Sequence, residues 1–132
     1  PFGYGLSYTR FAYSGLRVEA AAGEPVRVFV TVQNIGGRAG DEIVQAYIHL
    51  EDAEVPVPMR TLAAFRRVSL KPGERREVEL KLLPFALYEY EEDGARHTHS
   101  GQVRLWVGGR QPDERSRELT GTEVLETLFT LE

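Results

Sequence analysis

The sequence of 132 residues is 42% hydrophobic and 27% charged, with a net charge of −4. This length suits one domain with a real core. The negative net charge argues against nucleic acid or an anionic membrane as partner, since both select a basic face. No apolar run approaches the roughly 18 residues of a membrane-spanning helix. Cysteine is absent, which excludes a disulfide framework and a thiolate metal site and leaves a cytoplasmic and a periplasmic or secreted location both open.

The chain opens on aromatic, glycine-rich sequence. Residues 1–16 contain five Phe or Tyr and three Gly, although chain ends are usually polar. A first strand is expected from Phe11 to Val18. A second is predicted over 26–33, because four valines alternate there with polar residues and Phe29, and only a strand places alternate residues on one face.

Residues 41–50 read as a central strand, because apolar side chains fall on both of its faces. The segment 60–70 is ambiguous, since it spaces three apolar residues by three, as a helix would. Its position between Pro58 and Pro72 favours an irregular strand.

The second half of the chain again alternates. Residues 77–82 and 103–107 each predict a strand, and Trp106 is expected to point away from the apolar face of its strand. A last strand is expected over 124–131, although its apolar residues would also suit a helical turn. Short strands separated by turn sequences, without intervening long helices, predict an all-β fold, an antiparallel sandwich of about seven strands.

No catalytic carboxylate pair is identifiable. Asp41 and Glu42 are neighbours in a strand, so they point to opposite faces and cannot act together on one substrate. An acidic run precedes Gly94, and a solvated turn is the favoured interpretation of it. The run consists of Glu89, Glu91, Glu92 and Asp93.

A metal site is considered at His97 and His99. On a strand these two residues share a face and could hold one ion, but zinc needs at least a third protein ligand. An exposed hairpin strand is therefore the favoured interpretation. Neither a metal nor a cofactor is predicted.

Aromatic residues offer another kind of site. Trp106 projects outward, and Phe85, Tyr88 and Tyr90 cluster in sequence. Exposed aromatic rings can stack on sugars, but more often pack on a partner domain or a neighbouring loop, which is the favoured interpretation here.

Four stretches together resemble a known family in the family's own order. They are "PFGYGLSYTRFAYSGL", "VTVQNIGGRAGDEIVQAYI", "PMRTLAAFRRVSLKPGE" and "GQVRLWVGG". The resemblance is to the C-terminal fibronectin type III-like domain of family 3 glycoside hydrolases, the β-glucosidases, β-xylosidases and their relatives. The matching structural positions are Asn34, Gly36, Gly40, Asp41, Glu42, Gln45, Tyr47, Pro58, Leu62, Phe65, Pro72 and Gly73. The chain departs from the family at Arg60, at Ala64 and in the polar segment after Gly109.

The resemblance implies a non-catalytic, immunoglobulin-like domain with an extended N-terminal segment. Its partners would be the catalytic barrel and the α/β domain of the same parent chain, with oligosaccharide contact at loops as an additional role. Residues 1–15 would form the junction from an upstream domain, and residues 16–132 the sandwich. The junction residues expected to anchor the chain are Pro1, Phe2, Gly3, Tyr4, Gly5, Leu6, Ser7 and Tyr8.

Two alternatives stay open at this point. A carbohydrate-binding module would use Tyr88, Tyr90 and Trp106 as its stacking surface. A generic protein-interaction sandwich would have no connection with sugars.

Overall fold

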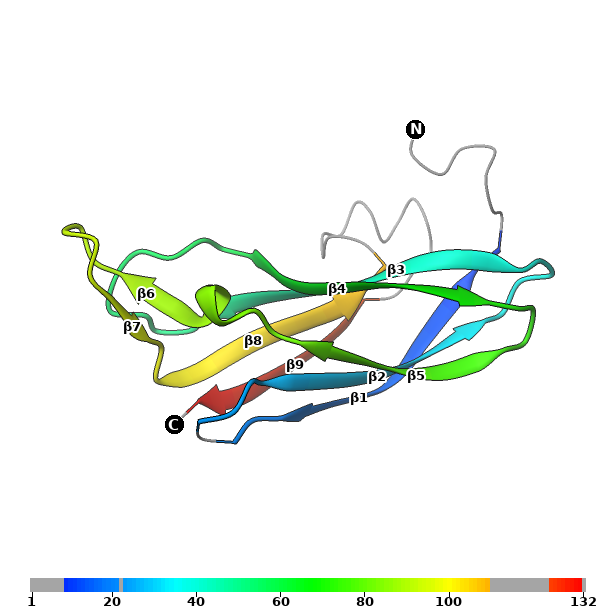
Figure 1. Cartoon of the computed structure of the whole chain (residues 1–132), viewed down its shortest axis with the longest axis horizontal. Helices are drawn as coiled ribbons and strands as arrows, with labels where there is room; N and C mark the ends of the chain where they lie inside the picture. The colour runs from blue at the N-terminus through cyan, green and yellow to red at the C-terminus, as the bar shows by residue number, and fades with distance from the viewer. Residues whose placement is uncertain (1–8, 22, 110–123, 132) are drawn as a thin grey trace.

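The computed structural model describes residues 9–21, 23–109 and 124–131. Two antiparallel sheets lie face to face, so the expected all-β sandwich is confirmed (Figure 1). The three-stranded sheet has the order β1-β2-β5 and comprises β1 (Phe11–Glu19), β2 (Arg27–Asn34) and β5 (Arg75–Lys81). The four-stranded sheet has the order β4-β3-β8-β9 and comprises β4 (Thr61–Leu70), β3 (Gly40–Leu50), β8 (Gly101–Gly108) and β9 (Leu125–Leu131).

An additional hairpin lies at one end of the sandwich (Figure 1). A 3₁₀ turn, η1 (Pro84–Leu87), leads into β6 (Tyr88–Tyr90), which pairs with β7 (Arg96–Thr98). In the described ranges the two main sheets hold the expected seven strands, and this hairpin raises the total to nine. The exposed hairpin strand expected at His97 and His99 is confirmed for His97, which lies on β7, and is wrong for His99, which follows β7 and is buried because its ring contacts Glu89.

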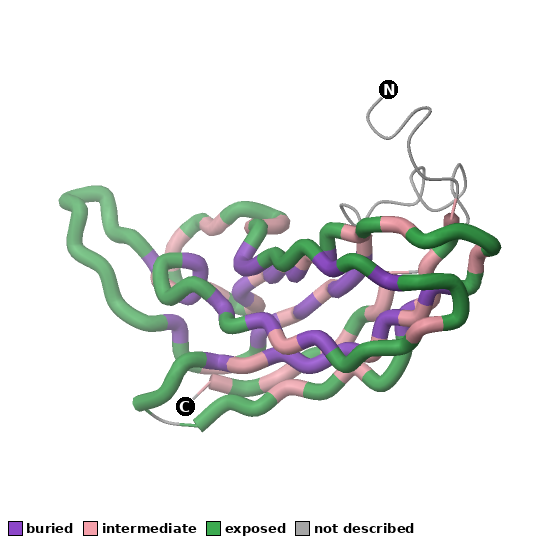
Figure 2. The backbone as a smooth tube through the Cα atoms, turned by 45° about the vertical axis from the view of Figure 1, so that its right-hand side comes forward, coloured by how far each residue is buried: buried purple, intermediate pink, exposed green. Residues whose placement is uncertain are grey.

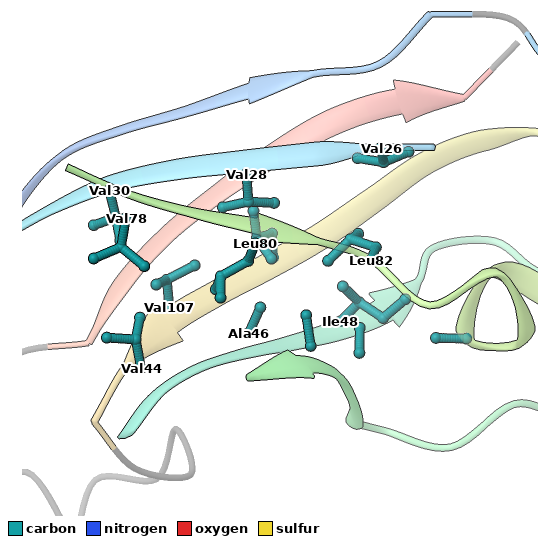
Figure 3. Packing of buried hydrophobic residues seen from close by; sticks show 14 of the residues in the cluster. Val26, Val28, Val30, Val44, Ala46, Ile48, Val78, Leu80, Leu82 and Val107 are labelled. Atoms are coloured by element: carbon teal, nitrogen blue, oxygen red, sulfur yellow. The ribbon is translucent and has the colours of Figure 1, made fainter. Parts of the chain in front are cut away.

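The core lies between the two sheets, where alternate residues of each strand meet (Figure 3). The valines of β2 face the inward apolar side chains of β3 and β8, because a period of two places every second side chain inward. Phe29 points outward from β2, and the Arg17 guanidinium lies 3.9 Å from its ring centroid. That outward residue is therefore also largely covered. Val28, Val30, Val32, Val44, Ala46, Val103, Leu105 and Val107 have no solvent exposure.

Both ambiguous segments are strands. Residues 61–70 form β4, the edge strand beside β3, with a bulge that places Ala63 and Ala64 both in the interior. Residues 125–131 form β9, which pairs with β8. Tertiary pairing decided these cases, because spacing by three is tolerated in a strand that contains a bulge.

The edges of the two sheets approach each other along both long sides of the sandwich. Strand β1 lies against β9 and β4 lies against β5. Exposed chain concentrates at the loops and at the hairpin (Figure 2). Within the residues that the structure describes, no helix has the length and apolar character needed to cross a bilayer.

Candidate functional site

The outer face of the four-stranded sheet is the candidate site, and we call it the outer face. Large apolar side chains point away from the core there. Phe65 on β4 is 65% exposed and Ile43 on β3 is 38% exposed. Leu62 of β4 and Leu128 of β9 are also exposed. Water-facing apolar side chains gathered on one face make it a candidate interaction surface.

A row of two aromatic residues and one leucine crosses the middle of the outer face. Tyr47 of β3 pairs with Leu62 on one side and with Trp106 of β8 on the other. Residues directly opposite in an antiparallel sheet project from the same face, so the three side chains lie next to one another. The expectation that Trp106 points away from the core is therefore confirmed, and the register shows which residues share its face.

Polar groups at one rim of this row are already satisfied. The Trp106 Nε1–H donates to Glu126 Oε1 at 3.0 Å. The Arg104 guanidinium bridges two carboxylates, with Nε 2.6 Å from Glu51 Oε1 and a second ion pair to Glu126. The hydrogen bond to Glu51, and then that to Glu126, raises the pKa of Arg104. The rim is therefore charged but internally paired, around an apolar centre.

Beside this row, the motif residues Gln45 and Tyr47 form a chain of hydrogen bonds. The Tyr47 hydroxyl donates to Gln45 Oε1 at 2.9 Å, and Gln45 Nε2 donates to the Gly109 carbonyl at 3.0 Å. This chain of hydrogen bonds fixes the phenol on the outer face and ties the end of β8 to β3. Gln45 thus fixes the position of the Tyr47 ring on the outer face.

Asp41 lies near the start of β3 and projects from the outer face. Its Oδ1 accepts a hydrogen bond from Ser69 Oγ at 2.7 Å, and its Oδ2 accepts one from Arg67 Nε at 3.0 Å. The Ser69 hydroxyl foremost, followed by Arg67, holds the pKa of Asp41 below its ordinary value of 3.8. Glu42 points to the opposite face, as expected for its neighbour in a strand, and accepts the Tyr13 hydroxyl at 2.8 Å.

The β2–β3 loop is built around one buried amide. Asn34 has no solvent exposure. Its Nδ2 donates to the carbonyls of Arg38 and Leu70 at 2.7 and 3.0 Å, and its Oδ1 accepts the Gly36 amide at 2.9 Å. Thr9 Oγ1 also donates to that oxygen. The Asn34 motif position is therefore structural, because one side chain joins three chain segments.

Two motif positions, Gly36 and Gly73, require glycine for geometric reasons. A Cβ at Gly36 would clash with the Thr9 side chain and lie 2.8 Å from the Arg10 amide nitrogen. Gly73 has φ of +80°, which non-glycine residues rarely adopt. The Gly73 amide donates to the Asn34 carbonyl at 2.8 Å.

The aromatic cluster at the hairpin forms a separate feature. The rings of Tyr88 and Tyr90 meet edge to face with centroids 6.2 Å apart. They line a pocket of about 230 Å³ together with Phe85, Pro56 and Val57, among others. Trp106 does not line this pocket, so it shares no surface there with the tyrosines.

The interpretation of the acidic run as wholly solvated is wrong for Glu89. Its side chain is only 3% exposed, and Oε2 lies 2.6 Å from His99 Nδ1, whose ring is 1% exposed. Burial, the largest influence, raises the pKa of Glu89, but the hydrogen bonds from His99 and the Glu54 amide, with the charges of His99 and His97, lower it overall. Glu91, Glu92 and Asp93 are exposed, as expected.

Fold and surface together define a fibronectin type III-like sandwich, and the comparisons agree. The model of the fibronectin type III-like domain family matches residues 42–111. The chain belongs to this family.

The relatives of the chain are β-glucosidases. It is 41% identical over 120 residues to β-glucosidase BoGH3A of Bacteroides ovatus, covering 87% of this chain and 16% of the relative. It is 34% identical over 119 residues to a β-glucosidase of Rhizobium radiobacter, covering 88% of this chain and 14% of that protein. The solved structure of DesR, a β-glucosidase from Streptomyces venezuelae in complex with D-glucose, superposes over 100% of this chain and 16% of its own, with a TM-score of 0.81 and 29% identity.

The chain therefore spans about a sixth of the length of such relatives. The resemblance to the fibronectin type III-like domain of family 3 enzymes is confirmed. The opening motif, Pro1 to Tyr8, lies outside the described residues.

Proposed function

We propose that the chain is a non-catalytic accessory domain of a family 3 β-glycosidase that packs on the catalytic part of the same polypeptide. Its relatives are β-glucosidases of which it matches only a small part, which supports a domain role within a larger hydrolase. The observation that carries the packing role is the exposed apolar outer face, with Phe65 at its edge.

The composition of the outer face suits a protein partner. Interfaces between domains have an apolar, aromatic centre and a polar rim. Tyr47 and Trp106 supply rigid aromatic area with few rotamers to restrict, while Arg104 keeps its charge paired within the domain. A partner can cover the centre without leaving the guanidinium unpaired.

The junction expected at residues 1–15 is part of this proposal. Phe2, Tyr4 and Tyr8 would continue the contact with the preceding domain, and Gly3 and Gly5 would permit a tight turn between the two domains. Tyr13, by contrast, belongs to β1 and is buried in the core of the sandwich. In this arrangement the domain stabilises the catalytic unit, and the two catalytic carboxylates belong to the rest of the parent chain.

The packing role is tested with Phe65→Asp in the parent enzyme, and Phe85→Asp serves as the matched control. Phe85 is 51% exposed but lies on η1, away from the outer face. In the 132-residue chain both variants should keep the stability of the wild type within about 0.5 kcal/mol, because neither ring is in the core. In the parent enzyme, only Phe65→Asp should lower the midpoint of thermal unfolding. An equal drop for both variants, or none for Phe65→Asp, would refute docking through the outer face.

The absence of catalysis is tested separately. The 132-residue chain and the parent enzyme are assayed on aryl β-glycosides. We expect turnover from the parent alone. Turnover by the chain at a rate near that of the parent would overturn the accessory role.

A second candidate function, sugar binding, is favoured by the hairpin pocket. Phe85 and Tyr90 are about half exposed there, whereas the Arg96 guanidinium lies over the Tyr88 ring at 4.9 Å from its centroid. The calorimetric test titrates glucan and xylan oligosaccharides into the wild type and Tyr90→Ala. Heats that are flat at millimolar ligand, or equal in the two proteins, would reject this function.

A further inference from the structure

We propose that Glu54, Glu89 and His97 form a binding site for a divalent transition-metal ion, with zinc as the best fit, at the base of the β6–β7 hairpin. Each residue offers one ligand atom, and the three atoms lie within 4.8 Å of one another. Two carboxylates and an imidazole, drawn from two segments distant in sequence, are a donor set that holds such ions. This inference does not depend on the proposed function.

The buried carboxylate is held in place for this role. Glu89 Oε2 is fixed by His99, and its Oε1 accepts the Glu54 backbone amide at 2.8 Å. A carboxylate oxygen has two acceptor positions, so Oε1 keeps one for a further partner. Hydrogen bonds of this kind orient a ligand before the metal binds.

The imidazole of His97 stands beside that oxygen. Its Nε2 is 3.7 Å from Glu89 Oε1 and its Nδ1 is 4.0 Å from Glu91 Oε1, and both distances exceed a hydrogen bond. In the described part of the chain no hydrogen bond holds this ring. Two ligand atoms of a tetrahedral zinc ion lie about 3.4 Å apart, given zinc–ligand bonds of about 2.1 Å, so His97 needs only a small adjustment to share an ion with Glu89.

The donor set selects among metals. Calcium and magnesium prefer oxygen ligands alone, whereas an imidazole favours zinc and its first-row neighbours. Three protein ligands leave a fourth position for water. His97 and Glu54 are partly or wholly exposed, so the ion can enter from solvent.

The test is calorimetric titration of zinc chloride into the chelator-treated 132-residue chain, with His97→Ala as the test variant and His49→Ala as the control. His49 Nε2 lies 3.8 Å from Glu51 Oε2, so His49 forms a similar imidazole–carboxylate pair but belongs to no group of three ligands in the described chain. We expect one zinc per chain, a loss of affinity of at least about tenfold in His97→Ala, and no loss in His49→Ala. Glu54→Gln should weaken binding in the same direction as His97→Ala.

Three results would overturn the site. They are no zinc binding by the wild type, equal affinity in the wild type and His97→Ala, and calcium binding as tight as zinc binding. Thermal unfolding provides a second readout, because an ion that binds only the folded state raises the midpoint. Zinc should raise the midpoint of the wild type and of His49→Ala but not that of His97→Ala, and circular dichroism verifies that each variant is folded.

Discussion

His99 and Glu89 form a hydrogen-bonded pair that is almost entirely shielded from water. Nδ1 of the imidazole lies 2.6 Å from Glu89 Oε2, and Nε2 lies 3.0 Å from the Gln102 carbonyl oxygen. Burial acts to raise the pKa of Glu89, but the hydrogen bonds from His99 and the Glu54 amide help to hold that pKa below its ordinary value. Through its two ring nitrogens His99 connects the hairpin to the start of β8.

Replacing one member of this pair should be severe. Glu89→Ala leaves the buried His99 ring and the Glu54 amide without that partner and should lower the free energy of unfolding by about 1–3 kcal/mol for each unsatisfied group. Urea denaturation in the presence of a chelator measures this effect. The exposed Glu91→Ala should stay within about 0.5 kcal/mol of the wild type. The double variant Glu89→Leu/His99→Leu should lose less than Glu89→Ala, and the pair interpretation fails if the double variant loses more.

Asn34 should be equally intolerant of change. Asn34→Ala leaves the buried Leu70 carbonyl and the Gly36 amide without that partner, at about 1–3 kcal/mol for each unsatisfied group. Asn34→Asp should also be destabilising, because a carboxylate cannot donate to the two carbonyls. Gln33→Ala is the control, since its amide makes only a 3.5 Å contact with Gly73. Similar urea midpoints for the Asn34 and Gln33 variants would contradict this assignment.

Two neighbouring glycines should differ in tolerance. Gly36→Ala forces a Cβ against Thr9 and Arg10 and should destabilise the fold by about 1–3 kcal/mol. A Cβ at Gly37 meets nothing within 4 Å, so Gly37→Ala should be nearly neutral. Thermal unfolding of the two variants compares them directly. The close-approach explanation requires this order, and the reverse order would exclude it.

The Asp41 carboxylate gives a pH dependence of known sign. Its pKa is lowered in the folded state, chiefly by the Ser69 hydrogen bond, so its contribution is present above the ordinary value of 3.8 and is lost as pH falls through the folded pKa. The stability difference between wild type and Asp41→Asn should therefore shrink on acidification below about pH 4. Urea unfolding across this range measures it. Ser69→Ala should reduce the same difference, and a difference that grows with acidification would have the wrong sign.

The sequence predicted the framework of the fold better than its surfaces. The valine alternation of β2 and the two-sided apolar pattern of β3 depend on local periodicity, which is visible without any partner. The outer face depends on register, because Leu62, Tyr47 and Trp106 become neighbours only when three strands pair. Nothing in the sequence indicated that the motif residues Gln45 and Tyr47 hydrogen-bond to each other.

The burial of Glu89 could not be predicted from its sequence neighbours. Glu89 looked solvated because its sequence neighbours are acidic and adjoin a glycine turn. Its burial depends on His99, across the hairpin, and on the Glu54 amide from a different loop. The signal available in the sequence was the pair His97 and His99 on the expected hairpin strand, since a histidine there can contact a carboxylate across the hairpin.

The base of the hairpin has a practical consequence. The His99 amide donates to the Leu87 carbonyl at 2.8 Å, so the two ends of the inserted segment lie side by side. The register of the seven sandwich strands is consequently uncoupled from the length of the tip beyond Glu89 and His99. We therefore expect residues 91–95, which are exposed, to accept an added peptide while the sandwich keeps its pairing.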